Sequence, residues 1–149
     1  MPRLDRARLE KGIFPFQCEV ATRFADIDRI GHVNNVATAS ILQEARARLA
    51  HEFDFAKVRK GQGLVVVSLT IEFVSDMFHP DPVQVSAGLL EIGRSSYRLG
   101  QIARQNGRIC AFAEAVQVAS DKNRSAPFND EWRDKLKSLL IRYPGENSD

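Results

Sequence analysis

The sequence predicts an α+β fold in a single domain, residues 1–149. One long segment free of glycine and proline carries apolar residues at helical spacing, whereas several later segments alternate between apolar and polar residues with a period of two. No internal repeat and no linker rich in proline, glycine or serine divides the chain. We therefore expect one core, in which a helix buries its apolar stripe against an antiparallel sheet.

A short strand and a long helix are the first expected elements. Apolar residues at 16, 18 and 20 alternate with their neighbours and indicate a half-buried strand. From 34 to 53, residues suited to burial recur at helical spacing: Thr38, Ile41, Leu42, Ala45, Leu49 and Phe53. The alanines of this helix permit close approach on more than one side, so a sheet is expected to wrap it.

Four antiparallel strands and a last helix are expected to follow. The first strand places these residues on one face: Val65, Val67, Leu69, Ile71 and Phe73. The second starts at Val83, and Gly88 predicts a bulge in it. Asn106-Gly107 between two strand-like runs predicts a hairpin. A helix over 130–142, capped by residue 129 or 130, completes the order.

Composition excludes several classes of protein. The chain has 21 basic and 19 acidic residues, and a net charge of +2 does not favour nucleic-acid binding. Charges interrupt the N-terminal segment, which leaves no signal peptide core, and the longest apolar run, Leu64–Val67, cannot span a membrane. Two cysteines without C-x-x-C spacing and three distant histidines predict no metal site and a cytoplasmic location.

The segment 23–35, RFADIDRIGHVNN, concentrates chemical groups immediately before the long helix. A helix N-terminus carries partial positive charge and unpaired N–H groups, so it can polarise a carbonyl group. A carboxylate beside it can attack that carbonyl or activate water. The same residue types also cap helices and form turns, so the segment alone supports both a catalytic and a structural interpretation.

Three strings in this region resemble the opening of hot-dog-fold acyl-CoA thioesterases of the 4-hydroxybenzoyl-CoA thioesterase type: Asp26-Ile27-Asp28, Gly31-His32-Val33-Asn34-Asn35 and Glu44-Ala45-Arg46. The similarity extends over nearly the whole chain. It implies the hot-dog fold, an antiparallel sheet wrapped around one long central helix, and assembly as a homodimer or homotetramer. It also implies hydrolysis of an acyl-CoA thioester to free acid and thiol at the subunit interface, with no cofactor beyond the CoA of the substrate.

The resemblance implies roles for individual residues. Asp28 matches the catalytic carboxylate, as nucleophile on the thioester or as base for water; its alternative, structural role is to cap the helix or to pair with Arg23 or Arg29. Asn35, or a backbone N–H near it, matches the group that polarises the thioester carbonyl, and Gly31 lets the backbone approach the substrate. His32 either orients Asp28, contacts the thioester or packs as an ordinary side chain.

A second segment is expected to bind the phosphate groups of CoA. Arg94, Ser95 and Ser96 match the residues that meet these phosphates in relatives, and a guanidinium binds phosphate through two hydrogen bonds. Glu44 is another candidate carboxylate, but Arg48 follows at i+4 and favours a structural ion pair. Relatives commonly carry tyrosines where this chain has Thr38 and Ile41, so the sequence does not determine which acyl group is bound. It also leaves two alternatives for the thiol carrier, CoA or an acyl carrier protein.

Three rival functions are compatible with the same sequence. A non-catalytic acyl-CoA-binding protein would keep the fold without releasing thiol. A hot-dog hydratase or dehydratase needs an acid and a base aimed at the α and β carbons, and the Asp28-to-His32 spacing does not favour it. A protein-interaction module built on the C-terminal helix would not bind CoA at all.

Overall fold

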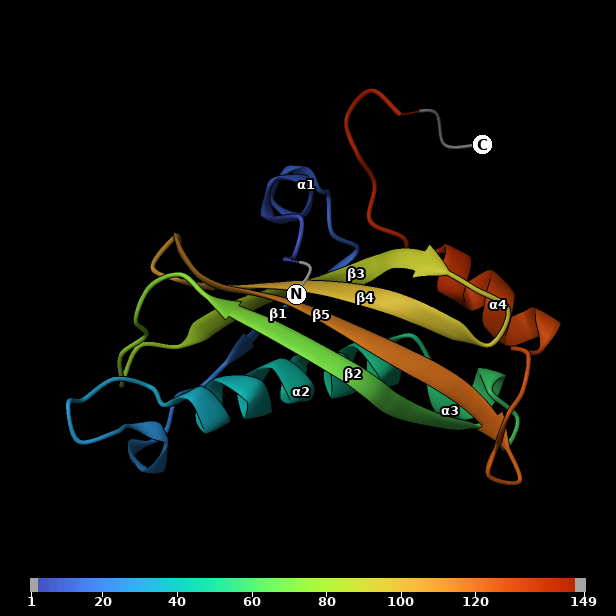
Figure 1. Cartoon of the computed structure of the whole chain (residues 1–149), viewed down its shortest axis with the longest axis horizontal. Helices are drawn as coiled ribbons and strands as arrows, with labels where there is room; N and C mark the ends of the chain where they lie inside the picture. Colours follow the sequence, from blue (N-terminus) through green and yellow to red (C-terminus); the bar gives the residue numbers. More distant parts are fainter. Residues whose placement is uncertain (1–2, 147–149) are drawn as a thin grey trace.

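A long helix, α2 (Asn35–Glu52), lies along the concave face of a curved antiparallel sheet (Figure 1). The structure is a computed structural model that describes residues 3–146. The strand order is β1-β3-β4-β5-β2, and β6 pairs with β5. The strands are β1 (Phe16–Val20), β2 (Gly63–Phe73), β3 (Val83–Ile92), β4 (Ser96–Gln105), β5 (Arg108–Asp121) and β6 (Arg124–Ser125). The predicted α+β fold, a sheet around one long central helix, is confirmed.

The helix α2 is capped at its start and lies close to the sheet. The Oδ1 atom of Asn34 accepts a hydrogen bond from the N–H of Ala37 at 2.8 Å, which caps the N-terminus. The buried apolar side of the helix consists of Ala37, Ile41, Leu42, Ala45 and Leu49. The first half of β5 carries small, fully buried side chains on its concave face: Ala111, Ala113 and Ala115. These alanines leave room for the helix inside the curved sheet.

A bulge in β2 changes which of its residues face the helix. The register with β5 shifts between Val66 and Ser68, so Val67 is the extra residue. Leu69 and Val66 pair with residues on the concave side of β5, whereas Val65 pairs with Val118 on the outer side. The expectation that Val65 shares a face with Leu69 is therefore wrong.

The bulge in β3 lies slightly beyond its predicted position, whereas the hairpin between β4 and β5 is as predicted. In β3 the register shifts between Leu89 and Glu91, so the bulge lies two residues beyond Gly88, where it was expected. The hairpin between β4 and β5 turns at Asn106 and Gly107, both with positive φ, as predicted.

The last helix, α4 (Asp130–Lys137), ends earlier than the predicted limit at 142. Beyond it, the carbonyl of Leu139 accepts the N–H of Leu89, and the carbonyl of Leu89 accepts the N–H of Ile141, both at 2.8 Å. The strand β1 pairs with β3 only as far as Ala87, so the next part of β3 offers free backbone groups. Pairing with them keeps the C-terminal segment extended. Two short helices, α1 (Arg6–Lys11) and α3 (Phe55–Val58), had no sequence signal.

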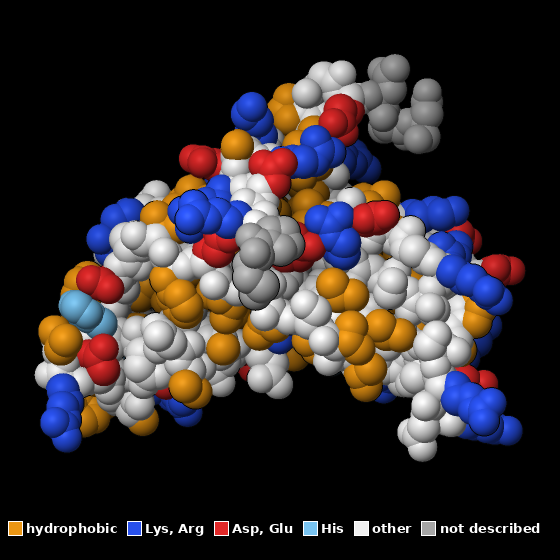
Figure 2. Space-filling view, viewed as in Figure 1, with side chains coloured by type: hydrophobic (Ala, Val, Ile, Leu, Met, Phe, Trp, Pro, Cys, Tyr) orange, Lys and Arg blue, Asp and Glu red, His pale blue; other side chains and the backbone are white. Residues whose placement is uncertain are grey.

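The strands run between two ends of the sheet, here called proximal and distal, and β2 is an edge strand. At the proximal end, β1 finishes at Val20 and β2 at Phe73; at the distal end, β3 finishes at Ile92 and β4 starts at Ser96. Within the described part of the chain, β2 pairs only with β5. Its exposed apolar side chains lie along this edge (Figure 2): Val65, Val66, Val67, Leu69 and Phe73. Such an edge is a template for pairing with another chain.

Candidate active site

The loop between β1 and α2 folds tightly around Asp28. The Oδ1 atom of Asp28 accepts the N–H of Ile30 at 2.9 Å and the N–H of His32 at 3.0 Å. The backbone N–H of Asp28 donates to the carbonyl of His32 at 2.8 Å. Gly31 has a φ of +92°, which a residue with a side chain rarely adopts, so this turn requires glycine.

This loop leaves one oxygen of Asp28 available for chemistry. Both side-chain hydrogen bonds of Asp28 use Oδ1, and among residues 3–146 no protein group bonds to Oδ2. The side chain is exposed to solvent. One oxygen therefore fixes the orientation of the carboxylate, and the other can attack a substrate carbonyl or accept a proton from water.

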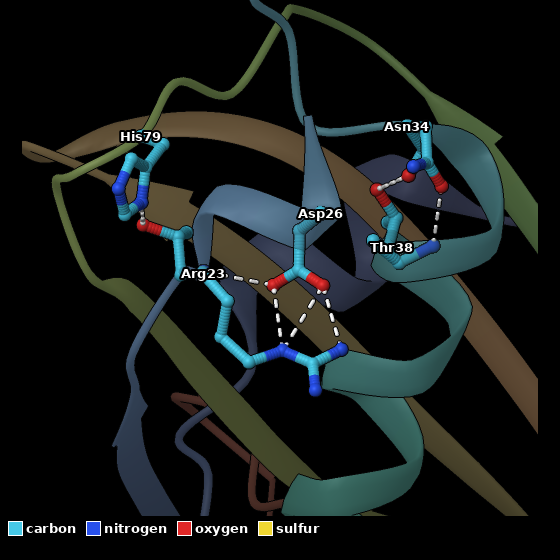
Figure 3. Close-up of polar contacts among 7 residues, drawn as sticks. Arg23, Asp26, Asn34, Thr38 and His79 are labelled. Atoms are coloured by element: carbon cyan, nitrogen blue, oxygen red, sulfur yellow. Dashed lines mark hydrogen bonds and ion pairs between the residues drawn. The ribbon is translucent and has the colours of Figure 1, made fainter. Parts of the chain in front are cut away.

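The neighbouring carboxylate, Asp26, is buried and holds the loop together (Figure 3). Its Oδ1 accepts the Nη2 of Arg23 at 2.8 Å, and its Oδ2 accepts the backbone N–H of Arg23 at 2.9 Å. Its own carbonyl accepts the N–H of Asn34 at 2.8 Å. The side-chain hydrogen bond from Arg23 lowers the pKa of Asp26. Asp26 is thus a structural anion that joins the start of the loop to the start of α2.

The N-terminus of α2, at the end of the loop that carries Asp28, supplies hydrogen-bond donors. Asn34 is the cap, and Thr38 Oγ1 donates to the carbonyl of Asn34 at 3.1 Å (Figure 3). Asn35 begins the helix with an exposed side chain. The first N–H groups of a helix have no partner within it, so those of Asn35 and Val36 are suited to stabilise an oxyanion.

The ring of His32 packs on the segment after β2. Its ring meets Phe78 edge to face, with centroids 5.1 Å apart. Its Nε2 lies 3.7 Å from Oδ2 of Asp76, and its connection to Asp28 is the backbone N–H described above. Of the roles open for His32, the geometry favours packing that orients the loop.

The expected phosphate-binding residues lie at the other end of the molecule. Arg94, Ser95 and Ser96 form the distal turn between β3 and β4, and Arg133 Nη2 donates to the carbonyl of Arg94 at 2.8 Å. The strand β3 separates this turn from the Asp28 loop by roughly 30 Å, at about 3.3 Å per residue. One chain thus brings Asp28, Gly31, His32 and Asn35 together, but not the Arg94 segment.

The other α2 residues singled out in the sequence, Thr38, Ile41 and Glu44, have structural roles. Thr38 and Ile41 are buried in the core. Glu44 accepts the Nε of Arg48 at 3.0 Å, the ion pair that the sequence favours. Two contacts were not predicted from the sequence: the Arg23–Asp26 ion pair and the contact between His32 and Asp76. The i,i+3 spacing of Arg23 and Asp26 could have indicated the first. The second joins segments that are distant in the sequence, so no local pattern indicates it.

Within residues 3–146, no helix is long and apolar enough to cross a membrane. The same part of the chain contains no group of three His, Cys, Asp or Glu side chains arranged to hold a metal ion.

Replacing Asp26 by asparagine should lower the free energy of unfolding by about 2 kcal/mol near pH 7, because a charged hydrogen bond to Arg23 is lost. The pKa of Asp26 is lowered in the folded protein, so its contribution is complete above the ordinary pKa and disappears as the pH falls through the lowered one. Urea unfolding of wild type and Asp26→Asn across the acidic range should show the two curves converging. Asp54→Asn is the control, because Asp54 is exposed and its side chain caps nothing. A gap that widens in acid would contradict this role.

The chain is similar in sequence and structure to thioesterases. A sequence model of the thioesterase-like superfamily matches residues 22–136. A solved thioesterase from Thermus thermophilus, complexed with coenzyme A and Zn, is 30% identical, with 85% of this chain and 95% of that chain covered and a TM-score of 0.76. A predicted thioesterase from Bacillus stearothermophilus is 26% identical, with 87% of this chain and 98% of that chain covered and a TM-score of 0.77.

Two more distant relatives extend this comparison. The uncharacterized protein YsmA of Bacillus subtilis is 24% identical over 132 residues, 88% of each chain. The 1,4-dihydroxy-2-naphthoyl-CoA thioesterase Slr0204 from Synechocystis is 18% identical, with 81% of this chain and 94% of that chain covered. It shares the fold, with a TM-score of 0.71. The match over most of the chain, together with the helix wrapped by its sheet, shows that this protein belongs to the thioesterase-like superfamily and has the hot-dog fold.

Proposed function

We propose that the protein hydrolyses the thioester bond of an acyl-CoA and releases a free acid and the thiol of CoA. The observation that carries this proposal is the free Oδ2 atom of Asp28, in a loop that leads directly into the N-terminus of α2. Membership of the thioesterase-like superfamily supports the reaction, and the coenzyme A bound to the similar Thermus thermophilus thioesterase supports the thiol.

The reaction has two forms that use the same geometry. In one, Oδ2 of Asp28 attacks the thioester carbon, the C–S bond breaks, and water hydrolyses the resulting anhydride. In the other, Oδ2 takes a proton from water, and the hydroxide attacks the same carbon. In both forms the carbonyl oxygen becomes negative, and N–H groups at Asn35 and Val36 stabilise it. The departing thiolate then takes up a proton.

Asp28→Asn should lower the turnover of the best acyl-CoA substrate by at least about 100-fold, because an amide keeps the shape of the carboxylate but has neither its charge nor its basicity. The amide oxygen can still accept the N–H groups of Ile30 and His32, so the loop should persist. Thiol release from short, long and aryl acyl-CoAs is the measurement. Glu44→Gln is the control and should stay within a few fold of wild type, because within residues 3–146 the Glu44 side chain hydrogen-bonds only to Arg48.

Other outcomes of this screen favour the rival functions. Wild-type protein that binds acyl-CoAs without releasing thiol is an acyl-CoA-binding protein. Hydration of an enoyl-CoA without thiol release indicates a hydratase. Equal loss of turnover in both variants contradicts the assignment of Asp28.

We also propose that a complete site needs two copies of the chain, paired in antiparallel fashion through their β2 edges. A twofold axis through this edge sets the proximal end of one β2 beside the distal end of the other. Ser95 is close to that distal end, because its carbonyl accepts the N–H of Ala119 and Ala119 pairs with Leu64 of β2. The pairing thus moves the Arg94 segment of the second copy toward Asp28 and covers the exposed valines of β2.

Arg94→Ala should raise the KM for an acyl-CoA by about 10-fold and leave the KM for the matching acyl-pantetheine nearly unchanged, because pantetheine lacks the nucleotide phosphates that the guanidinium binds. Steady-state kinetics with both esters measure the difference. Equal losses for the two esters would identify Arg94 as a structural residue.

Mixed dimers test whether the site spans two chains. Asp28→Asn and Arg94→Ala chains, unfolded and refolded together, should form hybrids in which one of the two sites keeps both wild-type residues. We expect a fraction of active sites with wild-type KM for acyl-CoA. If only the raised KM of Arg94→Ala is seen, or if the chain sediments as a monomer at micromolar concentration, the two-chain site is wrong.

A further inference from the structure

Arg46 places a positive charge inside the protein, between α2 and the sheet. Only 8% of its surface is exposed. Its Nη1 donates to Oε1 of Gln101 at 3.1 Å, and the Nε2 of Gln101 donates to the carbonyl of Leu42. Among residues 3–146, no carboxylate forms an ion pair with Arg46. Burial lowers the pKa of this guanidinium, and the nearby Tyr97 ring is neutral and fully buried.

A buried charge without an opposite charge is costly, so an anion supplied from outside the chain would stabilise Arg46. The helix geometry shows from which side it would come. Arg48, two residues later, donates to the carbonyl of Glu19 on β1. Residues two apart on a helix point in nearly opposite directions, at about 100° per residue, so Arg46 points away from β1 and toward the β2 side of the sheet.

The nearby part of β2 is its exposed middle. Arg46 donates a hydrogen bond to Gln101 of β4. Tyr97, on the same face of β4, also lies near Arg46. Following the pairing from β4 through β5, Gln101 corresponds to Ile71, and Tyr97 corresponds to Val66. Between them lies Leu69, 39% exposed. Arg46 therefore lies on the side of α2 that faces an apolar stretch of β2, which the described part of the chain leaves exposed.

A second copy paired through β2 would cover this surface without neutralising the charge. Two acidic residues beside this surface, Glu72 and Glu114, lie on the outer face, where Glu72 pairs with Arg6 and Glu114 with Arg98. On α2, Glu44 pairs with Arg48 on the β1 side. The residues of β2 that pair with the concave side of β5 include no carboxylate, so pairing through this edge would bring no acid from β2 to Arg46.

We propose that Arg46 binds the far carboxylate of the acyl group, so that the preferred substrates are monothioesters of dicarboxylic acids. This inference rests on the proposed function. Arg46 lies about three helical turns beyond Asn35, and helical side chains lean back toward the N-terminus, so an acyl chain of medium length along the β2 side of α2 would connect the two. Such a chain is apolar in the middle and anionic at its end, as is suited to Leu69 and then Arg46.

The test compares CoA monothioesters of adipic, suberic and sebacic acids with hexanoyl-, octanoyl- and decanoyl-CoA. Wild type should have a higher kcat/KM for the carboxylated member of at least one pair of equal length. Arg46→Gln should reduce that selectivity ratio by about 10-fold or more, as expected for the loss of one charged hydrogen bond, and Arg46→Lys should retain part of it. Wild type without this preference, or Arg46→Gln with an unchanged ratio, would overturn the inference.

Binding measurements separate this inference from the proposed function. Calorimetry with the Asp28→Asn protein should show tighter binding of the carboxylated ester of each preferred pair, even if no thioester is cleaved. Equal affinities for the two esters contradict the role of Arg46, whatever the outcome of the hydrolysis assay. If Arg46→Gln does not fold, the ester pairs with wild type and Asp28→Asn decide the question.

Discussion

The geometry of the candidate site depends on one buried carboxylate. Asp26 bonds to Arg23 through its side chain and to Asn34 through its carbonyl, so a single residue joins the two ends of the loop that carries Asp28. The N-terminus of α2 starts at a fixed place because of this link, and the alanine-lined sheet holds the rest of the helix. Two neighbouring aspartates therefore divide the work: the buried one builds the loop, and the exposed one has a free oxygen.

The sequence predicted the capped start of α2 behind this loop better than the contacts within the loop. Polar residues in front of a long amphipathic segment indicate a capped helix, and the cap at Asn34 follows that rule. The sequence also suggested Arg23 or Arg29 as partners for Asp28. Arg23 instead binds Asp26, because the short turn between them, Phe24–Asp26, brings the two side chains together at i,i+3 spacing.

The fold was predictable wherever the pattern is local, and less so where distant segments compete. The period of α2, the alternation in β2 from Leu69 onward and the Asn106-Gly107 turn depend on neighbouring residues, and each matches the structure. The bulge at Val67 and the extended segment after α4 depend on backbone groups offered by other strands. The environment of His32 likewise comes from Phe78 and Asp76, far along the chain.

The two ends of the sheet impose a further condition on function. A CoA ester that reacts at Asp28 and has its phosphates at Arg94 cannot use both residues of one chain, since the length of β3 separates them. The same edge strand that would bring in the second copy also leaves the inner side of β2 open beside Arg46, whose charge no described carboxylate balances. Pairing of the β2 edges would thus complete the phosphate site and enclose an acyl site in one step. Because the side chains on this inner surface are apolar except for the buried amides, the Tyr97 hydroxyl and Arg46, and Arg46 alone among them is charged, the surface would select the end of the acyl group by its charge.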